Sequence, residues 1–253
     1  MGKPRVAVFK FSSCGGCQLQ LLNIEDKLLD IVGAIDIVYF PMGKSENLEG
    51  PYDIGLVEGA ITCVEEIERI KKVRASCKIL IALGACACYG GIQSSRNWMP
   101  QRELEPRVYE HWEALASTKC FGIDEYVPVD LYLHGCPVDR EELLEVIKGL
   151  LVGTKPYLRP HSVCMECKLR ENECLFLKGI PCMGPVARAG CGAVCPSNGS
   201  PCSACRGPSN DANIESFIES LRELGLSNED IARMFRTYAS TSKPFAKVVS
   251  MYG

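Results

Sequence analysis

The residues of this sequence with the most chemistry are its cysteines. The chain has sixteen in 253 residues, and eight of them lie between Val163 and Pro208. It shows neither a secretory signal nor an apolar run of membrane-spanning length, so we expect a cytoplasmic protein with reduced thiols. In that compartment dense cysteines are more typical of metal binding or catalysis than of disulfides. Because prolines and glycines leave this segment little apolar core, we expect metal clusters to organise it.

Four other cysteines come directly after predicted strands or turns. Cys14 and Cys17 form a C-x2-C pair after the first strand, Cys86 is expected in the glycine-bounded loop GACACYGG after the fourth, and Cys136 lies in HGCPVD. The pair alone is also typical of a thiol redox motif. Because the carboxyl ends of parallel strands meet at one edge of an open sheet, all four thiols can converge there. Four thiolates around one point suit an iron-sulfur cluster or zinc.

Residues 1–155 have the alternating pattern of an α/β domain. Short apolar runs suited to buried parallel strands lie at Arg5–Phe11, Ile35–Phe40, Tyr52–Gly59 and Lys78–Gly84. Helical patterns lie at Gln18–Val32, after Thr62 with Glu65 as a capping box, and from Asp139 to Gly153. This alternation predicts a flavodoxin-like doubly wound parallel sheet.

Residues 156–253 form the second predicted domain, which is rich in cysteine and ends in helices. Two amphipathic stretches follow the cysteines, the first capped by Asp211 and the second by Ser227. We expect both helices to pack the end of the chain onto the rest of the fold. The domain as a whole is expected to be organised by iron-sulfur clusters.

The charge of the chain argues against nucleic acid as a partner. The net charge is -3, from 28 basic and 31 acidic residues that are interspersed along the sequence. The cysteine-rich segment has no arginine-rich stripe with stacking aromatic residues. We therefore expect neither a nucleic acid nor a membrane as the partner.

The motifs of the N-terminal domain together resemble the small subunit of nickel-iron hydrogenases. The electron-transfer subunit of respiratory complex I shares part of them. The matching motifs are the C-x2-C pair, VEGA at residues 57–60, G-x-C-A-x-x-G-G at 84–91, and GCP at 135–137. The resemblance implies a proximal 4Fe-4S cluster with the ligands Cys14, Cys17, Cys86 and Cys136.

The resemblance extends through the C-terminal cysteines and divides them into two sets. It implies a medial cluster held by Cys191, Cys195, Cys202 and Cys205. It implies a distal cluster held by Cys164, Cys167, Cys174 and Cys182. Respiratory, membrane-linked members usually have a histidine in place of Cys164 and commonly a proline in place of Cys195, so a 4Fe-4S rather than a 3Fe-4S medial cluster is expected here. In these respects the chain is most like the delta subunits of cytosolic sulfhydrogenases.

The function implied by the resemblance is electron transfer in a cytosolic hydrogenase heterotetramer. Hydrogen would be activated at a nickel-iron centre on the large subunit. The three 4Fe-4S clusters would carry electrons between that centre and an FAD-containing subunit that reduces NAD(P)+, with a further iron-sulfur subunit as an additional partner. Sulfur or polysulfide would be another acceptor. The alternatives are a deazaflavin-reducing or heterodisulfide-linked hydrogenase subunit, a complex I-type subunit, and a zinc-stabilised interaction module.

The remaining cysteines, Cys63, Cys77, Cys88 and Cys120, are expected to be small buried apolar residues. Cys88 is two residues from Cys86, so either of the two fits the position of the ligand. His134 is an ordinary histidine or a hydrogen-bond donor that tunes the proximal cluster. Glu58 is a carboxylate near that cluster or a structural residue at the end of a strand.

Overall fold

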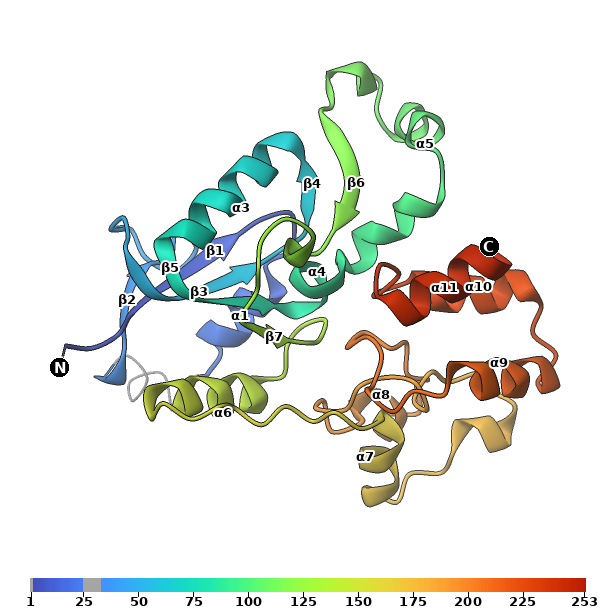
Figure 1. The fold of residues 1–253 in the computed structure, drawn as a ribbon. Coiled ribbons are helices and arrows are strands. Elements are labelled where there is room, and N and C mark those ends of the chain that lie inside the picture. Colours follow the sequence, from blue (N-terminus) through green and yellow to red (C-terminus); the bar gives the residue numbers. More distant parts are fainter. Residues whose placement is uncertain (1, 25–32) are drawn as a thin grey trace.

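A five-stranded parallel sheet forms the centre of the N-terminal part of the molecule (Figure 1). The computed structural model describes residues 2–24 and 33–253. The strands of the sheet are β1 (Arg5–Lys10), β2 (Asp36–Tyr39), β3 (Tyr52–Glu58), β5 (Cys77–Leu83) and β7 (Leu131–Leu133). They adjoin in the order β2-β1-β3-β5-β7, and every pair is parallel. This is the strand order of a flavodoxin-like doubly wound sheet, as predicted.

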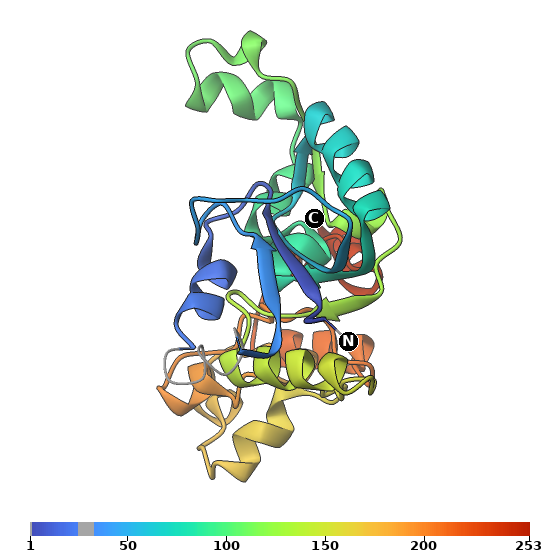
Figure 2. The same ribbon diagram turned by 90° about the vertical axis from the view of Figure 1, so that its left-hand side faces the viewer.

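Helices cover both faces of this sheet (Figure 2). One apolar core lies beneath α1 (Gly16–Leu22) and α6 (Arg140–Leu151). The other lies beneath α3 (Val64–Ser76) and α4 (Gly84–Tyr89). Successive residues of β1 alternate between the two cores, because successive side chains of a strand point to opposite faces. The short apolar runs of the sequence are therefore buried on both sides.

A smaller antiparallel pair and a projecting segment extend this domain. The pair consists of β4 (Ile61–Cys63) and β6 (Ser117–Phe121), which the sequence did not predict. The projecting segment between them, seen at the top of Figure 2, contains α5. The short elements of this region are η2 (Gly91–Trp98), α5 (Gln101–Val108), η3 (Trp112–Ala114) and η4 (Ile123–Glu125).

The C-terminal region consists of a cysteine-rich segment with short helices, followed by three longer helices. Its elements are α7 (Val163–Leu169), η5 (Leu175–Lys178), α8 (Val194–Ser197), α9 (Ile214–Glu223), α10 (Asn228–Arg236) and α11 (Lys243–Tyr252). Across the described ranges, none of the helices combines the length and the apolar character that a membrane crossing requires. The last helix, α11, was not predicted from the sequence.

The C-terminal region has an apolar core of its own. The rings of Phe217 (α9), Phe235 (α10) and Phe245 (α11) meet edge to face, with successive centroids 6.1 and 4.9 Å apart. Val163 and Met183 of the cysteine-rich segment are buried in the same core. The expectation that this region has little core of its own is therefore wrong. Burial of apolar surface contributes to its folding, because the cysteine loops supply apolar residues between their thiols.

Two of the predicted helix starts are displaced. Thr62 belongs to β4, and its backbone N–H donates to the Glu66 carboxylate at 2.8 Å, so Glu66 takes the place predicted for Glu65. The cap of α9 is Asn213, whose side chain accepts the N–H of Ser216, and not Asp211. Asp and Asn side chains both cap helices, so the residue types alone did not distinguish Asp211 from Asn213 as the cap.

Two further helix predictions have different outcomes. Ser227 caps α10 by accepting the N–H of Asp230, as predicted. The predicted helix at Gln18–Val32 begins as α1, which ends at Leu22. Its last part, residues 25–32, lies outside the described residues.

Replacement of Phe235 by alanine tests the apolar core of the C-terminal region. Phe235 is buried between two other phenylalanine rings, so we expect Phe235→Ala to lower the free energy of unfolding by about 3–5 kcal/mol. The measurement is chemical unfolding of the purified protein. Met251→Ala, at an exposed position of α11, is the control and should change the stability by less than about 0.5 kcal/mol. Equal losses in both variants would contradict the assignment of this core.

Candidate metal centres

The first group of cysteines lies at the carboxyl edge of the parallel sheet. Cys14 follows β1, Cys17 is in α1, Cys86 is in α4, and Cys136 follows β7. Burial raises the pKa of Cys86 to about 12, and the charges of Cys136 and Cys14 contribute to the rise. Burial and the charge of Cys14 likewise raise the pKa of Cys136. The fold therefore brings these four thiols close enough together to influence one another's ionisation.

A buried carboxylate borders this group. Glu58, the last residue of β3, accepts the backbone N–H of Cys17 at 3.0 Å through Oε1, whereas its Oε2 has no hydrogen-bond partner. Burial first, and then the charge of Glu58, holds the pKa of Cys17 well above its usual range. Glu58 thus both ends a strand and faces the cysteines. Because so many anionic groups repel one another when ionised, the donor set fits a cationic group such as cluster iron.

Two glycines permit the close approach of chain and thiol in this group. A Cβ at Gly84 would lie 2.3 Å from Sγ of Cys17, and a Cβ at Gly91 would lie 2.6 Å from Sγ of Cys86. Both glycines have a positive φ, +85° and +61°, which residues with a side chain rarely adopt. The glycines that bound the sequence motif are therefore required by space as well as by backbone conformation.

The short helix α4 directs its two cysteines to different surroundings. Cys86 is half-buried, and its Sγ lies 3.4 Å from Oε1 of Gln93 on the side of the other three thiols. Cys88 is buried in the core beneath α3, where its Sγ faces the carbonyl oxygen of Leu133 at 3.5 Å. Both residues are helical, so the expectation that Cys86 lies in a loop is wrong. The geometry favours Cys86 over Cys88 as a ligand.

A second group of cysteines surrounds the loop after α7. Burial raises the pKa of Cys164 to about 11, with further contributions from Cys182, Cys167 and Cys174. A Cβ at Gly184 would lie 3.2 Å from Sγ of Cys164, so the chain also passes close to a thiol here. The four cysteines predicted as distal ligands therefore lie together.

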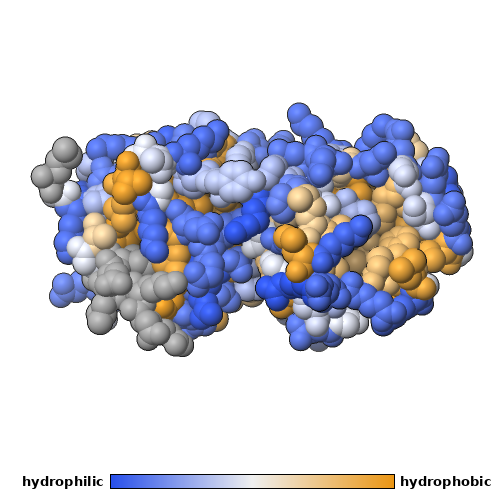
Figure 3. Space-filling model, turned by 90° about the horizontal axis from the view of Figure 1, so that it is seen from below, coloured by the Kyte–Doolittle hydropathy of each residue, from blue (hydrophilic) through white to orange (hydrophobic). Residues whose placement is uncertain are grey.

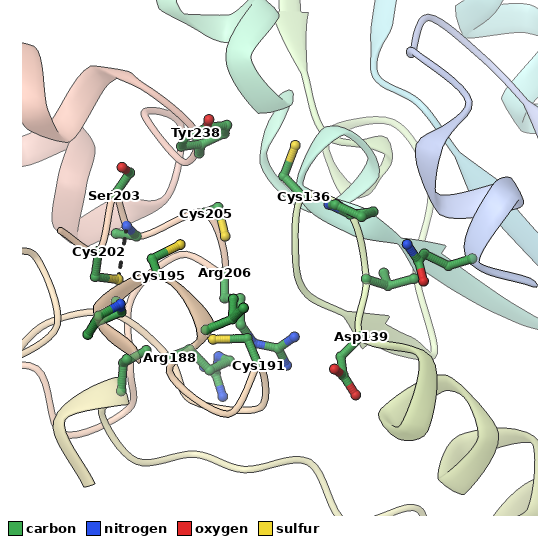
Figure 4. A pocket seen from close by; sticks show the side chains of 18 of the residues that line it. Cys136, Asp139, Arg188, Cys191, Cys195, Cys202, Ser203, Cys205, Arg206 and Tyr238 are labelled. Carbon is green, nitrogen blue, oxygen red and sulfur yellow. Dashed lines mark hydrogen bonds between the residues drawn. The ribbon is translucent and has the colours of Figure 1, made fainter. Parts of the chain in front are cut away.

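The third group lines a cavity of about 550 Å³ between the two parts of the molecule (Figure 4). Burial raises the pKa of Cys205 to about 11, raises the pKa of Cys191, and holds the pKa of Cys202 well above its usual range. The cysteines that line the cavity are Cys191, Cys195, Cys202 and Cys205, together with Cys136 of the first group.

The three groups are joined in series by contacts between backbone amides and sulfur. The Cys205 thiol faces the backbone N–H of Cys136, which lowers the pKa of that thiol. The N–H of Cys202 donates to Sγ of Cys182 at 3.2 Å. The third group therefore lies between the first and the second.

The grouped thiols are not arranged around single ions. Within residues 2–24 and 33–253, no three His, Cys, Asp or Glu side chains are positioned to hold one metal ion. In a 4Fe-4S cluster each thiolate binds its own iron, so the ligands need not meet at a single point. The structure therefore brings the thiols together in groups without forming a mononuclear site.

His134 is part of an aromatic stack. Its ring is parallel to those of Tyr89 and Tyr132, with centroids 5.4 and 6.2 Å away. Burial lowers the pKa of His134 to about 3, and its Nδ1 has no hydrogen-bond partner. No hydrogen bond from this ring to Cys136 is seen. The side chain is therefore neutral and packs the loop that carries Cys136.

Of the four cysteines outside the three groups, three are buried as predicted and one is not. Cys77, Cys88 and Cys120 are buried, and Cys63 is half-buried. One functional candidate was missed by the sequence reasoning, namely Arg206, which is buried directly after Cys205. An arginine beside a cysteine gives no sign of its burial in the sequence, because arginine is usually exposed.

A doubly wound sheet with thiols at its carboxyl edge, followed by a cysteine-rich helical region, defines an iron-sulfur electron-transfer subunit. Comparison with known proteins supports this class. The family described as NADH ubiquinone oxidoreductase, 20 Kd subunit, matches residues 14–150. The delta subunit of sulfhydrogenase 2 from Pyrococcus furiosus is 40% identical over 93% of this chain and 99% of its own length.

Two further proteins are similar to the chain. A subunit of the F420-non-reducing hydrogenase of Methanocaldococcus jannaschii is 34% identical over 80% of this chain and 81% of its own. A chain of a NAD+-reducing [NiFe]-hydrogenase structure is 30% identical, with a TM-score of 0.55, over 62% of this chain and 95% of its own. The chain belongs to the family of nickel-iron hydrogenase small subunits, as its sequence motifs predicted.

A matched pair of glycine substitutions tests the close approach at Gly84. Gly84→Ala and Gly153→Ala both place alanine at positive φ, +85° and +71°, but only the first adds a clash with Cys17. We expect Gly84→Ala to lower the free energy of unfolding of the metal-free protein by about 1–3 kcal/mol more than Gly153→Ala. Chemical unfolding of the two variants measures the difference. Equal losses of stability in the two variants would show that the Cys17 side chain moves away from the added Cβ without a cost in free energy.

Proposed function

We propose that this chain relays electrons through three 4Fe-4S clusters in a cytoplasmic sulfhydrogenase-type complex. The observation that carries the proposal is that twelve cysteines form three groups joined in series. Residues 1–155 would carry the proximal cluster and residues 156–253 the medial and distal clusters. The ligands would be Cys14, Cys17, Cys86 and Cys136 (proximal), Cys191, Cys195, Cys202 and Cys205 (medial), and Cys164, Cys167, Cys174 and Cys182 (distal).

The residues of this chain would hold the clusters and tune them. Bound 4Fe-4S clusters supply one-electron transfer. Backbone amides donate to thiol sulfur atoms within the groups, as from Gly16 to Cys14 at 3.4 Å and from Ala204 to Cys202 at 3.4 Å. Such bonds stabilise the negative charge of a ligand sulfur and so influence the reduction potential.

The two ends of the series open to the surface, where partners would bind. Cys14 and Cys136 are exposed at the proximal end, which would face the large subunit and its nickel-iron centre. Exposed apolar side chains surround the distal end, and this face of the molecule is seen in Figure 3. These residues are Met165, Leu169, Leu177 and Ile180. Exposed apolar side chains of this kind mark protein interfaces. This end would face the FAD-containing, NAD(P)-reducing subunit or an intervening iron-sulfur subunit.

The similarity to hydrogenase subunits favours a hydrogenase subunit over a complex I-type subunit or a zinc-stabilised module. The NADH ubiquinone oxidoreductase match ends at residue 150, whereas the sulfhydrogenase relative covers the cysteine-rich region as well. The similarity to an F420-non-reducing hydrogenase favours one second candidate, a subunit that passes electrons to a heterodisulfide-linked partner. Purification of the native complex would distinguish the two candidates. Only the sulfhydrogenase-type complex is expected to contain a flavin subunit that reduces NAD(P)+.

The iron content of the anaerobically purified complex tests the number of clusters. We expect about twelve iron atoms and no stoichiometric zinc on this chain, from three clusters with four thiolates each. Cys86→Ala should remove the proximal cluster, because it deletes a thiol that faces the other three. Cys88→Ala is the matched control and should retain all the iron, since Cys88 lies in the apolar core. Loss of iron in the control alone would reverse the ligand assignment.

The role of Cys195 is tested by proline, the residue that respiratory, membrane-linked members of the family commonly have at this position. Cys195 lies in the first turn of α8, where a proline is tolerated because the first helical N–H groups lack intrahelical acceptors. We expect Cys195→Pro to convert the medial cluster from 4Fe-4S to 3Fe-4S. The oxidised variant should then show the near-isotropic paramagnetic resonance signal of that cluster.

The catalytic consequence follows from the potential. A 3Fe-4S cluster generally has a higher potential, so hydrogen evolution should decrease more than hydrogen oxidation. Retention of four irons at this site would mean that Cys195 is not a ligand. Equal changes in both directions would refute the potential argument and leave the ligand assignment intact.

A further inference from the structure

Arg206 is a buried arginine with three directed hydrogen bonds. Its side chain is 3% exposed, and it follows Cys205 directly. Nε donates to the carbonyl of Ala189 at 2.7 Å, and Nη1 donates to the carbonyl of His134 at 2.6 Å. Nη2 donates to Oε2 of Glu142 at 2.5 Å. One planar guanidinium therefore connects four segments of the chain.

Three of these segments carry cysteines of two different groups. Arg206 itself adjoins Cys205, and Ala189 is two residues before Cys191, so both segments carry cysteines of the third group. His134 is two residues before Cys136 of the first group. The guanidinium thus holds the first and third groups together at the place where the Cys205 thiol faces the N–H of Cys136.

The third partner, Glu142, holds the positive charge of Arg206 in this position. Glu142 lies in the first turn of α6 and is 1% exposed, so the ion pair is almost completely removed from water. A buried charge is stable only when it is paired and hydrogen-bonded, and each partner here makes that possible for the other. The chain also closes tightly over the pair. A Cβ at Gly190 would lie 2.3 Å from Nη2 of Arg206 and 2.6 Å from Oε1 of Glu142.

The positive charge acts on the thiols of the third group. The buried Arg206 guanidinium lines the same cavity as Cys191, Cys195, Cys202 and Cys205. It therefore stabilises negative charge in this group. An electron added to a bound cluster is also negative charge, and net charge near a cluster sets its potential.

We propose that Arg206, held by Glu142, is a positioning residue that fixes the junction between the proximal and medial sites and makes the medial cluster easier to reduce. The proposal rests on the ligand assignment under Proposed function. It adds to that assignment a residue outside the ligand sets. Neutral substitutions of Arg206 and Glu142 should shift the potential of the medial cluster in opposite directions. The first removes a positive charge and the second removes a negative charge.

Redox titration followed by paramagnetic resonance tests the charge. In Arg206→Gln we expect the midpoint potential of the medial cluster to shift downward, and in Glu142→Gln to shift upward. The distal cluster should keep its potential in both variants. Arg233→Gln is the charge-matched control, since Arg233 is an exposed residue of α10 whose partners are Glu229 and Asp230. It should leave all three potentials unchanged.

A conservative variant tests the positioning. Arg206→Lys keeps the charge but lacks the planar fork that donates in three directions. We expect its medial potential to lie nearer the wild-type value than that of Arg206→Gln. The magnetic interaction between the reduced proximal and medial clusters should weaken, because their spacing is no longer fixed. An unchanged interaction would contradict the positioning role.

The iron content of each protein is measured first, so that two kinds of failure are distinguished. A wild-type protein without a medial cluster would overturn the ligand assignment. If the wild type has this cluster, shifts of the same sign in Arg206→Gln and Glu142→Gln, or equal shifts of the distal cluster, would overturn only the role of Arg206. If Arg206→Gln loses iron, Glu142→Gln decides, and the absence of an upward shift there refutes the proposal.

Discussion

Neighbouring buried thiols cannot all ionise unless a positive partner offsets the loss of water and their mutual repulsion. Both effects are visible in the first group, where burial and the neighbouring thiols raise the pKa of Cys86 to about 12. The carboxylate of Glu58 adds further negative charge at the same place. Iron bound by the thiolates would offset these costs, since metal binding and folding are coupled in such sites. The rest of the structure provides the positions at which this coupling can occur.

The parallel sheet provides the first of these positions. Strand ends on one edge bring together loops that are distant in the sequence, and the thiols of those loops meet there. Space is limited at this edge, because a Cβ at Gly84 would overlap Sγ of Cys17. The same short helix sends Cys86 toward the group and Cys88 into the core, since residues two apart lie on different sides of a helix.

The C-terminal region combines two sources of stability. Three phenylalanines from successive helices form an apolar core, while the segment that precedes these helices places eight cysteines in two groups. Arg206 then ties one of these groups to the sheet domain through His134 and Glu142. A buried ion pair of this kind contributes to geometry more than to stability, because desolvation offsets much of its attraction.

The sequence by itself determined the doubly wound sheet and the family. Short β-branched apolar runs that alternate with helical patterns are typical of parallel strands buried on both faces. The spacing of cysteines and glycines in the motifs indicated the family. Only the tertiary structure decided that Cys86 and not Cys88 faces the other thiols, that Glu58 borders them, and that the C-terminal region has its own core. It also revealed Arg206, because burial and hydrogen-bond partners depend on residues far apart in the sequence, such as His134 and Glu142. Local patterns carry no information about contacts of that range.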